Sequence, residues 1–381
     1  MIISRIILKN WRNFPHADVP LGSRIFLIGP NACGKSNFLD AFRFLRDIAK
    51  PGGGLQSAVK QRGGLSKIRS LSAPRSPDVE IEVHFSDASG ILWKYRIGIS
   101  QLTSGHRYTY LTHESVMKGN EIILNRPDEK DRGDELRLTQ THLEQIIANT
   151  DFREISKFLN SILYLHLVPQ LIRHPDAFAG QGIPEDPFGR SFLERMAKTP
   201  QKTRKTRLKK IGEALRIAVP QLQDLSDTKD ELGVPHLEAV WQHWRPNAGK
   251  QREDQFSDGT LRLIGLLWSL LENDALLLLE EPELSLNSGI VRKLPALLHR
   301  FQSKKKKSQI ILSTHSYDLL SEQGIGAEEV LMLKPEKEGT AVVPAASDKD
   351  IRNLLGGGMS IADAVIPAVI PDNIHQLDIF I

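Results

Sequence analysis

A glycine-framed loop near the N-terminus carries the residues with the clearest chemistry. Residues 24–45 read RIFLIGPNACGKSNFLDAFRFL, in which Gly29, Gly34, Lys35 and Ser36 form the pattern G-x-x-x-x-G-K-S. Glycines let the chain curl until several backbone N–H groups point at one phosphate, while lysine and serine supply a cation and a magnesium ligand. The residues before the loop predict a strand and those after it an amphipathic helix. The loop is therefore a candidate site for a nucleoside triphosphate with Mg²⁺.

Two adjacent carboxylates, Glu280 and Glu281, follow an apolar run in the sequence LLLLEEPE (276–283). A short continuous apolar run is typical of a strand buried on both faces of a parallel sheet, and ligands bind at the C-terminal ends of such strands. We expect Glu280 to hold Mg²⁺, directly or through water, and Glu281 to polarise the attacking water. Glutamate at 280, where many enzymes with this loop carry aspartate, favours contact through water.

Two further segments end in polar residues. Residues 255–271, QFSDGTLRLIGLLWSLL, place a Ser-Asp-Gly-Thr turn before an apolar helix, and this turn is either an anion-binding helix end or a simple helix cap. Residues 308–320, SQIILSTHSYDLL, predict a strand that ends in Ser313, Thr314 and His315. Because this strand follows the carboxylate strand by one helix, as in a βαβ unit, we expect His315 to reach the γ-phosphate or the attacking water. A purely structural histidine is the alternative.

The composition limits the class of protein. The chain has 381 residues, 40% of them hydrophobic, and its one cysteine is Cys33. One cysteine excludes an internal disulfide and a Cys-rich zinc site, and no apolar run reaches the ~18 residues that span a membrane. We therefore expect a cytoplasmic protein without membrane contact. The net charge of +4 permits contact with nucleic acid but does not require it.

The pattern along the chain predicts an α/β fold in three parts. Residues 79–126 alternate between polar and apolar and predict an antiparallel sheet, which places an N-terminal lobe at 1–139. A helical insertion is expected at 140–250, with helices up to residue 222. The C-terminal lobe, 251–381, then holds the two carboxylates and His315 on a mixed sheet.

The order and spacing of these motifs resemble the ABC-type ATPases of the RecF/SMC-like and OLD-like group, some of which serve bacterial anti-phage defence. We expect neither the coiled-coil arms nor the Toprim nuclease domain that some members carry, because no heptad repeat persists between the loop and the signature and the last 50 residues lack clustered carboxylates. The segments that resemble the group's motifs are an N-terminal motif LKNWRNF (8–14), a Walker A motif GPNACGKSN (29–37), a signature FSDGTLR (256–262), a Walker B motif with D-loop LLLLEEPELSLN (276–287), and a switch-histidine motif LSTHS (312–316).

The resemblance implies an ATPase that works as a head-to-tail homodimer, in which the signature of one subunit closes on ATP held by the other. It implies catalytic roles for Glu281 and His315. The implied nucleotide-binding residues are Arg12, Asn13, Gly29, Pro30, Asn31, Ala32, Cys33, Gly34, Lys35, Ser36 and Asn37. The implied signature residues in trans are Ser257, Asp258, Gly259 and Thr260, and the implied magnesium site comprises Ser36, Glu280 and Gln61. Asp258, Thr260 and Asn287 depart from the usual signature and D-loop residues.

Gln61 lies in a glycine-rich segment, residues 51–68, that predicts a mobile loop. It is a candidate for the family's magnesium-sensing glutamine, and an exposed loop glutamine is the alternative.

Positive charge is densest between residues 195 and 210. Three interpretations of this segment are open: it binds DNA or RNA, it is a solvated helix face, or it docks a partner protein. The run Lys304–Lys307 suits a helix C-terminus, and the last residues, HQLDIFI (375–381), suit a final strand or an interaction peptide.

These features predict an ATPase that dimerises on ATP and controls a separate effector, a nuclease or toxin, in DNA maintenance or anti-phage defence. The alternative is a low-turnover scaffold that sequesters such a partner.

Overall fold

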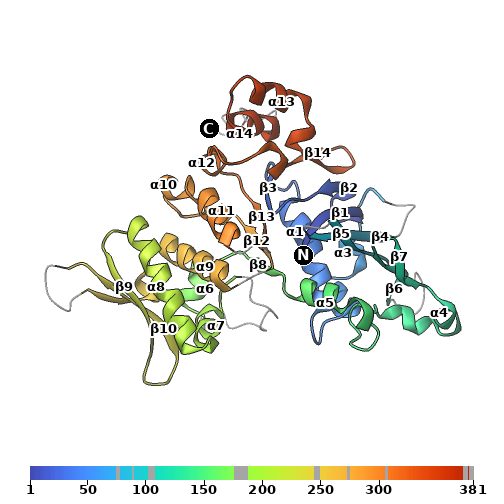
Figure 1. Cartoon of the computed structure of the whole chain (residues 1–381), viewed down its shortest axis with the longest axis horizontal. Coiled ribbons are helices and arrows are strands. Elements are labelled where there is room, and N and C mark those ends of the chain that lie inside the picture. Colours follow the sequence, from blue (N-terminus) through green and yellow to red (C-terminus); the bar gives the residue numbers. More distant parts are fainter. Residues whose placement is uncertain are drawn as a thin grey trace.

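A computed structural model describes residues 1–73, 78–87, 90–101, 108–175, 188–243, 249–272, 275–304, 308–371 and 376. Figure 1 shows a central sheet with an antiparallel sheet and helix α1 on one side and helices α9 to α11 on the other. In the part of the chain described, we find no helix both long enough and apolar enough to cross a membrane.

The central sheet has six strands in the order β15-β14-β3-β13-β12-β8. Five of them are parallel to one another, and β15 pairs antiparallel to β14. The predicted strands before the phosphate-binding loop, the carboxylates and His315 are β3, β12 and β13, so the expected parallel arrangement is confirmed. Their bounds are β3 Arg24–Ile28, β8 Leu163–Leu165, β12 Leu276–Glu280, β13 Gln309–Ser313, β14 Val330–Glu336 and β15 Gly339–Pro344.

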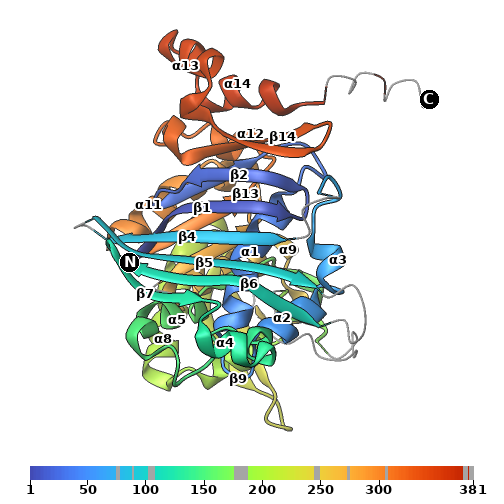
Figure 2. The same ribbon diagram turned by 90° about the vertical axis from the view of Figure 1, so that its right-hand side faces the viewer.

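The second sheet is wholly antiparallel, in the order β2-β1-β4-β5-β6-β7, which confirms the alternating pattern predicted between residues 79 and 126. Figure 2 views it face-on, with the C-terminal elements above. The strands are β1 Ile2–Trp11, β2 Phe14–Pro20, β4 Val79–Asp87, β5 Gly90–Gln101, β6 Thr109–Lys118 and β7 Glu121–Arg126.

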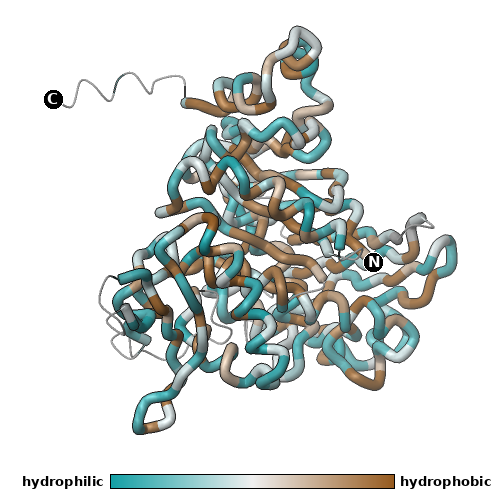
Figure 3. The backbone as a smooth tube through the Cα atoms, turned by 60° about the vertical axis from the view of Figure 1, so that its left-hand side comes forward, coloured by the Kyte–Doolittle hydropathy of each residue, from teal (hydrophilic) through white to brown (hydrophobic). Residues whose placement is uncertain are grey.

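Alternate side chains of the central strands enter two different hydrophobic clusters. Ile25 and Leu27 of β3 pack in the cluster that contains α1 (Lys35–Ala49) and the antiparallel sheet. Phe26 and Ile28 pack in the cluster that contains α9 (Asp258–Glu272) and α11 (Leu294–Lys304). Since strand side chains alternate between faces, α1 and α9 cover opposite faces of one sheet. Figure 3 shows these hydrophobic segments inside the molecule.

Shorter helices and a third sheet complete the fold. The three-stranded sheet β11-β10-β9 packs with α7 and α8 and lies away from the central sheet in Figure 1. Its strands are β9 Leu222–Lys229, β10 Pro235–Trp241 and β11 Lys250–Arg252. The remaining helices are α2 Leu55–Gln61, α3 Leu65–Ile68, α4 Glu129–Gly133, α5 Arg153–Asn160, α6 Pro169–Arg173, α7 Phe192–Lys198, α8 Gln201–Ala218, α10 Ser288–Val291, α12 Tyr317–Leu320, α13 Lys349–Gly356 and α14 Ile361–Val365.

The prediction of a mobile loop at 51–68 is wrong, because this segment forms α2 and α3. Its glycines stand at the helix ends, with Gly54 and Gly64 preceding α2 and α3, so they do not weaken the helix interiors. Leu55 and Ala58 are fully buried, and this burial holds α2 against the core.

The wholly helical reading of residues 140–222 is also wrong at β8, which joins the edge of the central sheet beside β12. A run of three residues is too short to show a strand period. The residues Lys305–Lys307 and most of the tail 375–381 lie outside the described residues, so the predictions for them stay predictions.

Candidate nucleotide site

The loop after β3 has the tight backbone that a phosphate cradle needs. Gly34 caps α1 with a left-handed φ of 99°, and a Cβ atom there would come within 2.1 Å of the Asn13 amide nitrogen. A Cβ at Gly29 would come within 2.6 Å of both the Cys33 Sγ and the Leu333 carbonyl oxygen. Real Cβ contacts are never this short, so both positions require glycine.

Lys35 lies inside the curve of the loop. Its Nζ donates hydrogen bonds of 3.1 Å to the carbonyl oxygens of Gly29 and Pro30, and the residue is buried. Burial lowers the pKa of Lys35, and the nearby Cys33 and the glutamates 280, 281 and 283 oppose that shift. The first N–H groups of α1 lack partners within the helix and stand beside this cation, so the loop fits an anionic phosphate group.

Asn13 braces the loop from the antiparallel sheet. Its Nδ2 donates to the Cys33 carbonyl and to the Thr340 hydroxyl, both at 2.7 Å, and its Oδ1 accepts a 2.9 Å hydrogen bond from Asn37. Asn13 thus fixes the phosphate-binding loop through its backbone. It lies beside the nucleotide site, as the resemblance implies.

Arg12 pairs with Asp40 of α1 at 2.8 Å, and Arg62 binds the same carboxylate. Arg12 also lines an open cavity of about 840 Å³, together with Asn13 and Asn37. This cavity flanks the loop and is large enough for the nucleoside end of a nucleotide. The other residues that line it are mostly polar or basic, including Ser66, Lys67, Arg69, Ser70 and Lys337.

Glu280 stands at the end of β12 and faces the loop. Its Oε1 accepts a short hydrogen bond from the Ser36 hydroxyl, and its Oε2 accepts one from the Tyr164 hydroxyl. Ser36 and Glu280 therefore meet as predicted, and these two oxygen-bearing side chains fit a Mg²⁺ ion. The described residues contain no group of three or more His, Cys, Asp or Glu that could bind a metal, so a bound Mg²⁺ needs oxygens from the nucleotide and water.

Glu281 and His315 are in direct contact. The His315 Nε2 lies 3.3 Å from the Glu281 Oε1, and the Glu281 backbone has a left-handed φ of 44°. Burial and the nearby Lys35 lower the pKa of His315, and Glu281 opposes that shift, so the net effect favours the neutral ring. A neutral ring both donates and accepts hydrogen bonds, which suits a group that orients water beside a carboxylate.

Glu283 fixes the loop that carries His315. Its Oε1 accepts a 2.5 Å hydrogen bond from the Thr314 hydroxyl and a 3.4 Å bond from the His315 N–H. A cavity of about 520 Å³ runs between Pro30, Asn31 and His315, so the loop and the histidine border one space.

The signature turn begins α9. The Ser257 hydroxyl accepts a 3.2 Å hydrogen bond from the Thr260 N–H, which makes Ser257 a helix cap. Asp258 binds Arg173 and accepts a 3.2 Å bond from Gln170. Among the described residues, no hydrogen bond joins this turn to the loop at 29–36. The cap reading is thus confirmed, and the exposed Ser257 leaves the anion-binding reading open.

No hydrogen bond among the residues that the structure describes links Gln61 to Glu280. It ends α2, and its amide donates a 3.2 Å hydrogen bond to Ser57 of the same helix. The second oxygen of Glu280 is instead bound by Tyr164, a residue that the sequence analysis missed because β8 is so short.

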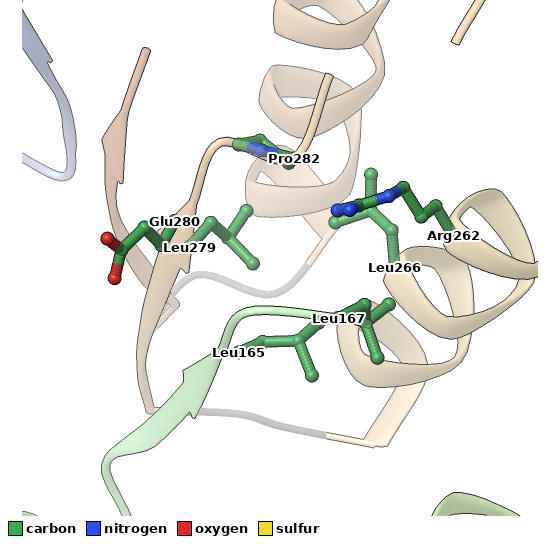
Figure 4. Close-up of a pocket in the computed structure, with 7 residues that line it drawn as sticks. All are labelled: Leu165, Leu167, Arg262, Leu266, Leu279, Glu280 and Pro282. Atoms are coloured by element: carbon green, nitrogen blue, oxygen red, sulfur yellow. The ribbon is translucent and has the colours of Figure 1, made fainter. Parts of the chain in front are cut away.

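A small space beside Glu280 is no ligand site. Figure 4 shows Arg262 and Leu266 of α9 facing Leu165 and Leu167, while the Glu280 carboxylate points away. The volume of about 10 Å³ is no more than one water molecule needs.

The fold and site together define an ATPase of the ABC type. The family model "AAA domain, putative AbiEii toxin, Type IV TA system" matches residues 24–321, and the chain belongs to this family.

Individual proteins resemble this chain over a short stretch of sequence or in their fold. The chain is 45% identical over 42 residues to "DNA replication and repair protein RecF" of Proteus mirabilis, a match over 11% of this chain and 12% of that protein. It resembles an SMC head bound to the C-winged helix domain of ScpA, with a TM-score of 0.52, 15% identity, and coverage of 90% and 98%. The SMC head domain of Thermotoga maritima gives a TM-score of 0.47 and 15% identity, with coverage of 90% and 99%. At such identities the structural likeness shows the fold alone.

Proposed function

We propose that this ATPase binds ATP with Mg²⁺ between the loop at 29–36 and the carboxylates of Glu280 and Glu281, and that two copies close head-to-tail on two nucleotides. Closure then controls a separate effector protein, a nuclease or a toxin, in DNA maintenance or anti-phage defence.

Different residues of the chain bind the phosphates, the metal and the attacking water. The loop amides and Lys35 bind phosphate, and Ser36 and Glu280 would hold the metal, which would neutralise phosphate charge. Glu281 takes a proton from the attacking water, and His315 holds that water in line. Asn13, Asn37 and Arg12 border the nucleoside end.

The placement of the signature carries the proposal of closure in trans. The turn at 257–260 contacts the segment that follows β12, because a Cβ at Gly259 would come within 2.5 Å of the carbonyl oxygen of Ser285, five residues beyond the end of that strand. Yet α9 covers the face of the sheet opposite α1. One chain thus presents the loop and an exposed Ser257 at the same sheet edge but from opposite faces, which suits a two-fold pair of copies.

Replacing Ser257 with arginine is expected to abolish ATP-driven dimerisation while each monomer still binds ATP. The long cation would stand where the facing subunit's γ-phosphate must approach a compact helix end. Sedimentation of Ser257→Arg, in a Glu281→Gln background that retains ATP, measures this. A dimer that persists with and without ATP would show that the copies associate through another surface.

The family description, a putative AbiEii toxin of a type IV toxin–antitoxin system, supports a role in such a system. Control of a separate effector goes beyond that description and is our proposal. The proposed insertion, residues 140–250 between lobes at 1–139 and 251–381, supplies surface outside the central sheet for such a partner. The alternative function, a scaffold that binds ATP and sequesters its partner with little turnover, uses the same surface. Partner release that requires the intact Glu281 would favour the ATPase cycle over the scaffold.

The basic segment is less free to bind nucleic acid than its sequence indicates. Arg195 pairs with Glu272 at 3.3 Å, Arg204 pairs with Asp227 at 2.8 Å, and the Arg207 guanidinium lies 5.2 Å from the Trp268 ring centre. These three arginines stabilise the insertion. The exposed cations that remain are Lys198, Lys202, Lys205, Lys209 and Lys210.

A salt titration is expected to decide whether these lysines bind a phosphate backbone. If they do, affinity for duplex DNA falls with salt at a log–log slope of about −0.9 per phosphate contacted, and Lys202→Glu with Lys205→Glu and Lys209→Glu abolishes binding. Basal ATP hydrolysis should not change, since none of the three belongs to the nucleotide site. Absence of DNA and RNA binding by the parent at low salt, with ATP and Mg²⁺, would favour the scaffold.

A further inference from the structure

Tyr164 binds the carboxylate that the proposed function assigns to magnesium. It is the middle residue of β8 and pairs in register with Leu278 of β12, two residues before Glu280. Its hydroxyl donates to the Glu280 Oε2, while the Glu280 Oε1 accepts from Ser36. Both oxygens of this carboxylate are thus held by hydroxyl groups on two different elements, a strand and a helix.

The ring of Tyr164 is itself fixed in place. The residue is 7% exposed and lies in the hydrophobic cluster beneath the antiparallel sheet. The guanidinium of Arg43 lies 4.2 Å from the ring centre, within the range of a cation–π contact. Arg43 and Ser36 both belong to α1, so the helix that follows the phosphate loop also orients the tyrosine.

The two hydroxyls differ in what they can do when a metal binds. The Ser36 hydroxyl must turn from Glu280 to become a metal ligand, and this leaves the Glu280 Oε1 free for the same ion or for its water shell. The Tyr164 ring is buried and contacts Arg43, which favours persistence of its hydrogen bond to the Oε2. The Glu280 carboxylate therefore keeps its orientation while Ser36 turns to the metal, and no further rotamer entropy is lost when the metal binds.

We infer that Tyr164 is a positioning residue that holds Glu280 ready for Mg²⁺ and so sets the magnesium affinity of the nucleotide site. The inference rests on the proposed binding of ATP with Mg²⁺ at this site. Partners of this kind, one step removed from a metal, typically change metal affinity by about 10- to 100-fold.

The test is Tyr164→Phe, which removes the hydroxyl and keeps the ring. We expect the Mg²⁺ concentration for half-maximal tightening of ATP binding, measured by calorimetry, to rise by about 10-fold or more. Affinity for ATP without Mg²⁺ should stay the same. Mn²⁺ titrated against the ATP complex and followed by electron paramagnetic resonance gives a second readout that does not depend on turnover.

Tyr95→Phe is the matched control. Tyr95 also donates its hydroxyl to a glutamate, the Oε1 of Glu114 at 3.1 Å, but in the antiparallel sheet and fully buried. This variant loses the same kind of hydrogen bond and should keep the parent's magnesium dependence. In a Glu280→Gln background, Tyr164→Phe should have no further effect on magnesium dependence, because a positioning residue acts only through its partner.

Magnesium dependence equal to the parent's in Tyr164→Phe would overturn this inference and leave the proposed function standing. The same shift in Tyr95→Phe would also overturn it, by showing a general effect of stability. A parent protein whose ATP binding ignores Mg²⁺ would overturn the proposed metal site and this inference together.

Discussion

Glu281→Gln is expected to lower ATP turnover by about 10²- to 10⁴-fold, the usual loss when a general base is removed. The amide cannot accept the proton of the attacking water, but it keeps the size and the position 3.3 Å from His315. ATP binding should therefore persist, and the proposed closed dimer should accumulate. Phosphate release under saturating ATP measures the first effect, and sedimentation with ATP measures the second.

Lys35→Ala is the contrasting variant, expected to lose ATP binding itself. The buried amine is the cation at the centre of the phosphate loop, and alanine supplies no charge there. Calorimetry with ATP separates the two variants, one retaining and one losing the ligand. If both bind ATP and hydrolyse it like the parent, the site lies elsewhere.

Arg126→Met is expected to reduce the free energy of unfolding by about 3–5 kcal/mol, the loss typical of removing one partner from a buried ion pair. Arg126 lies between Glu114 and Asp131, at 3.0 and 2.8 Å, and the side chains of both carboxylates are fully buried. Burial raises the pKa of Glu114. At Asp131 burial also acts to raise the pKa, but hydrogen bonds from Arg126, the Asp128 N–H and Arg137 outweigh it and bring the pKa below its ordinary value. Methionine leaves these buried groups without their shared cation.

Urea unfolding at pH 7 measures this loss, and Arg5→Met is its control. Arg5 pairs with Asp18 at 2.6 Å, but the two side chains are 46% and 33% exposed. Solvent screens such a pair, so the control should change stability by no more than about 1 kcal/mol. Equal effects of the two substitutions would show that the Arg126 pairs do not anchor the segment after β7.

Local sequence was enough for the elements that carry the nucleotide site. The strand, loop and helix from Arg24 to Ala49 are contiguous, and their patterns of apolar residues and glycines need no distant partner to be read. The same holds for β12 and β13, which are short apolar runs that end in polar residues. Parallel pairing then brings Glu280 level with Ser313.

Features that depend on distant contacts were not predictable in this way. The segment 51–68 folds because Arg62 pairs with Asp40 and Asp47 of α1 and because Leu55 is buried, and neither contact is visible in a glycine-rich run. Tyr164 was missed for a similar reason, since only the pairing of β8 with β12 brings it to Glu280. The sequence of the basic segment also did not show that three of its arginines find partners within the fold.

Helix α9 is packed from two sides, and this links the signature to the insertion. One side rests on the central sheet, while Trp268 on the other side packs edge-to-face with Phe192 of α7, their ring centres 6.2 Å apart, and meets Arg207 of α8. Trp268 is fully buried, so α7 and α8 cannot shift without repacking the helix that begins at the signature. Under the proposed function, a partner bound to α7 and α8 would therefore act through this helix on the turn at 257–260, about 15 Å from Trp268 at 1.5 Å per residue.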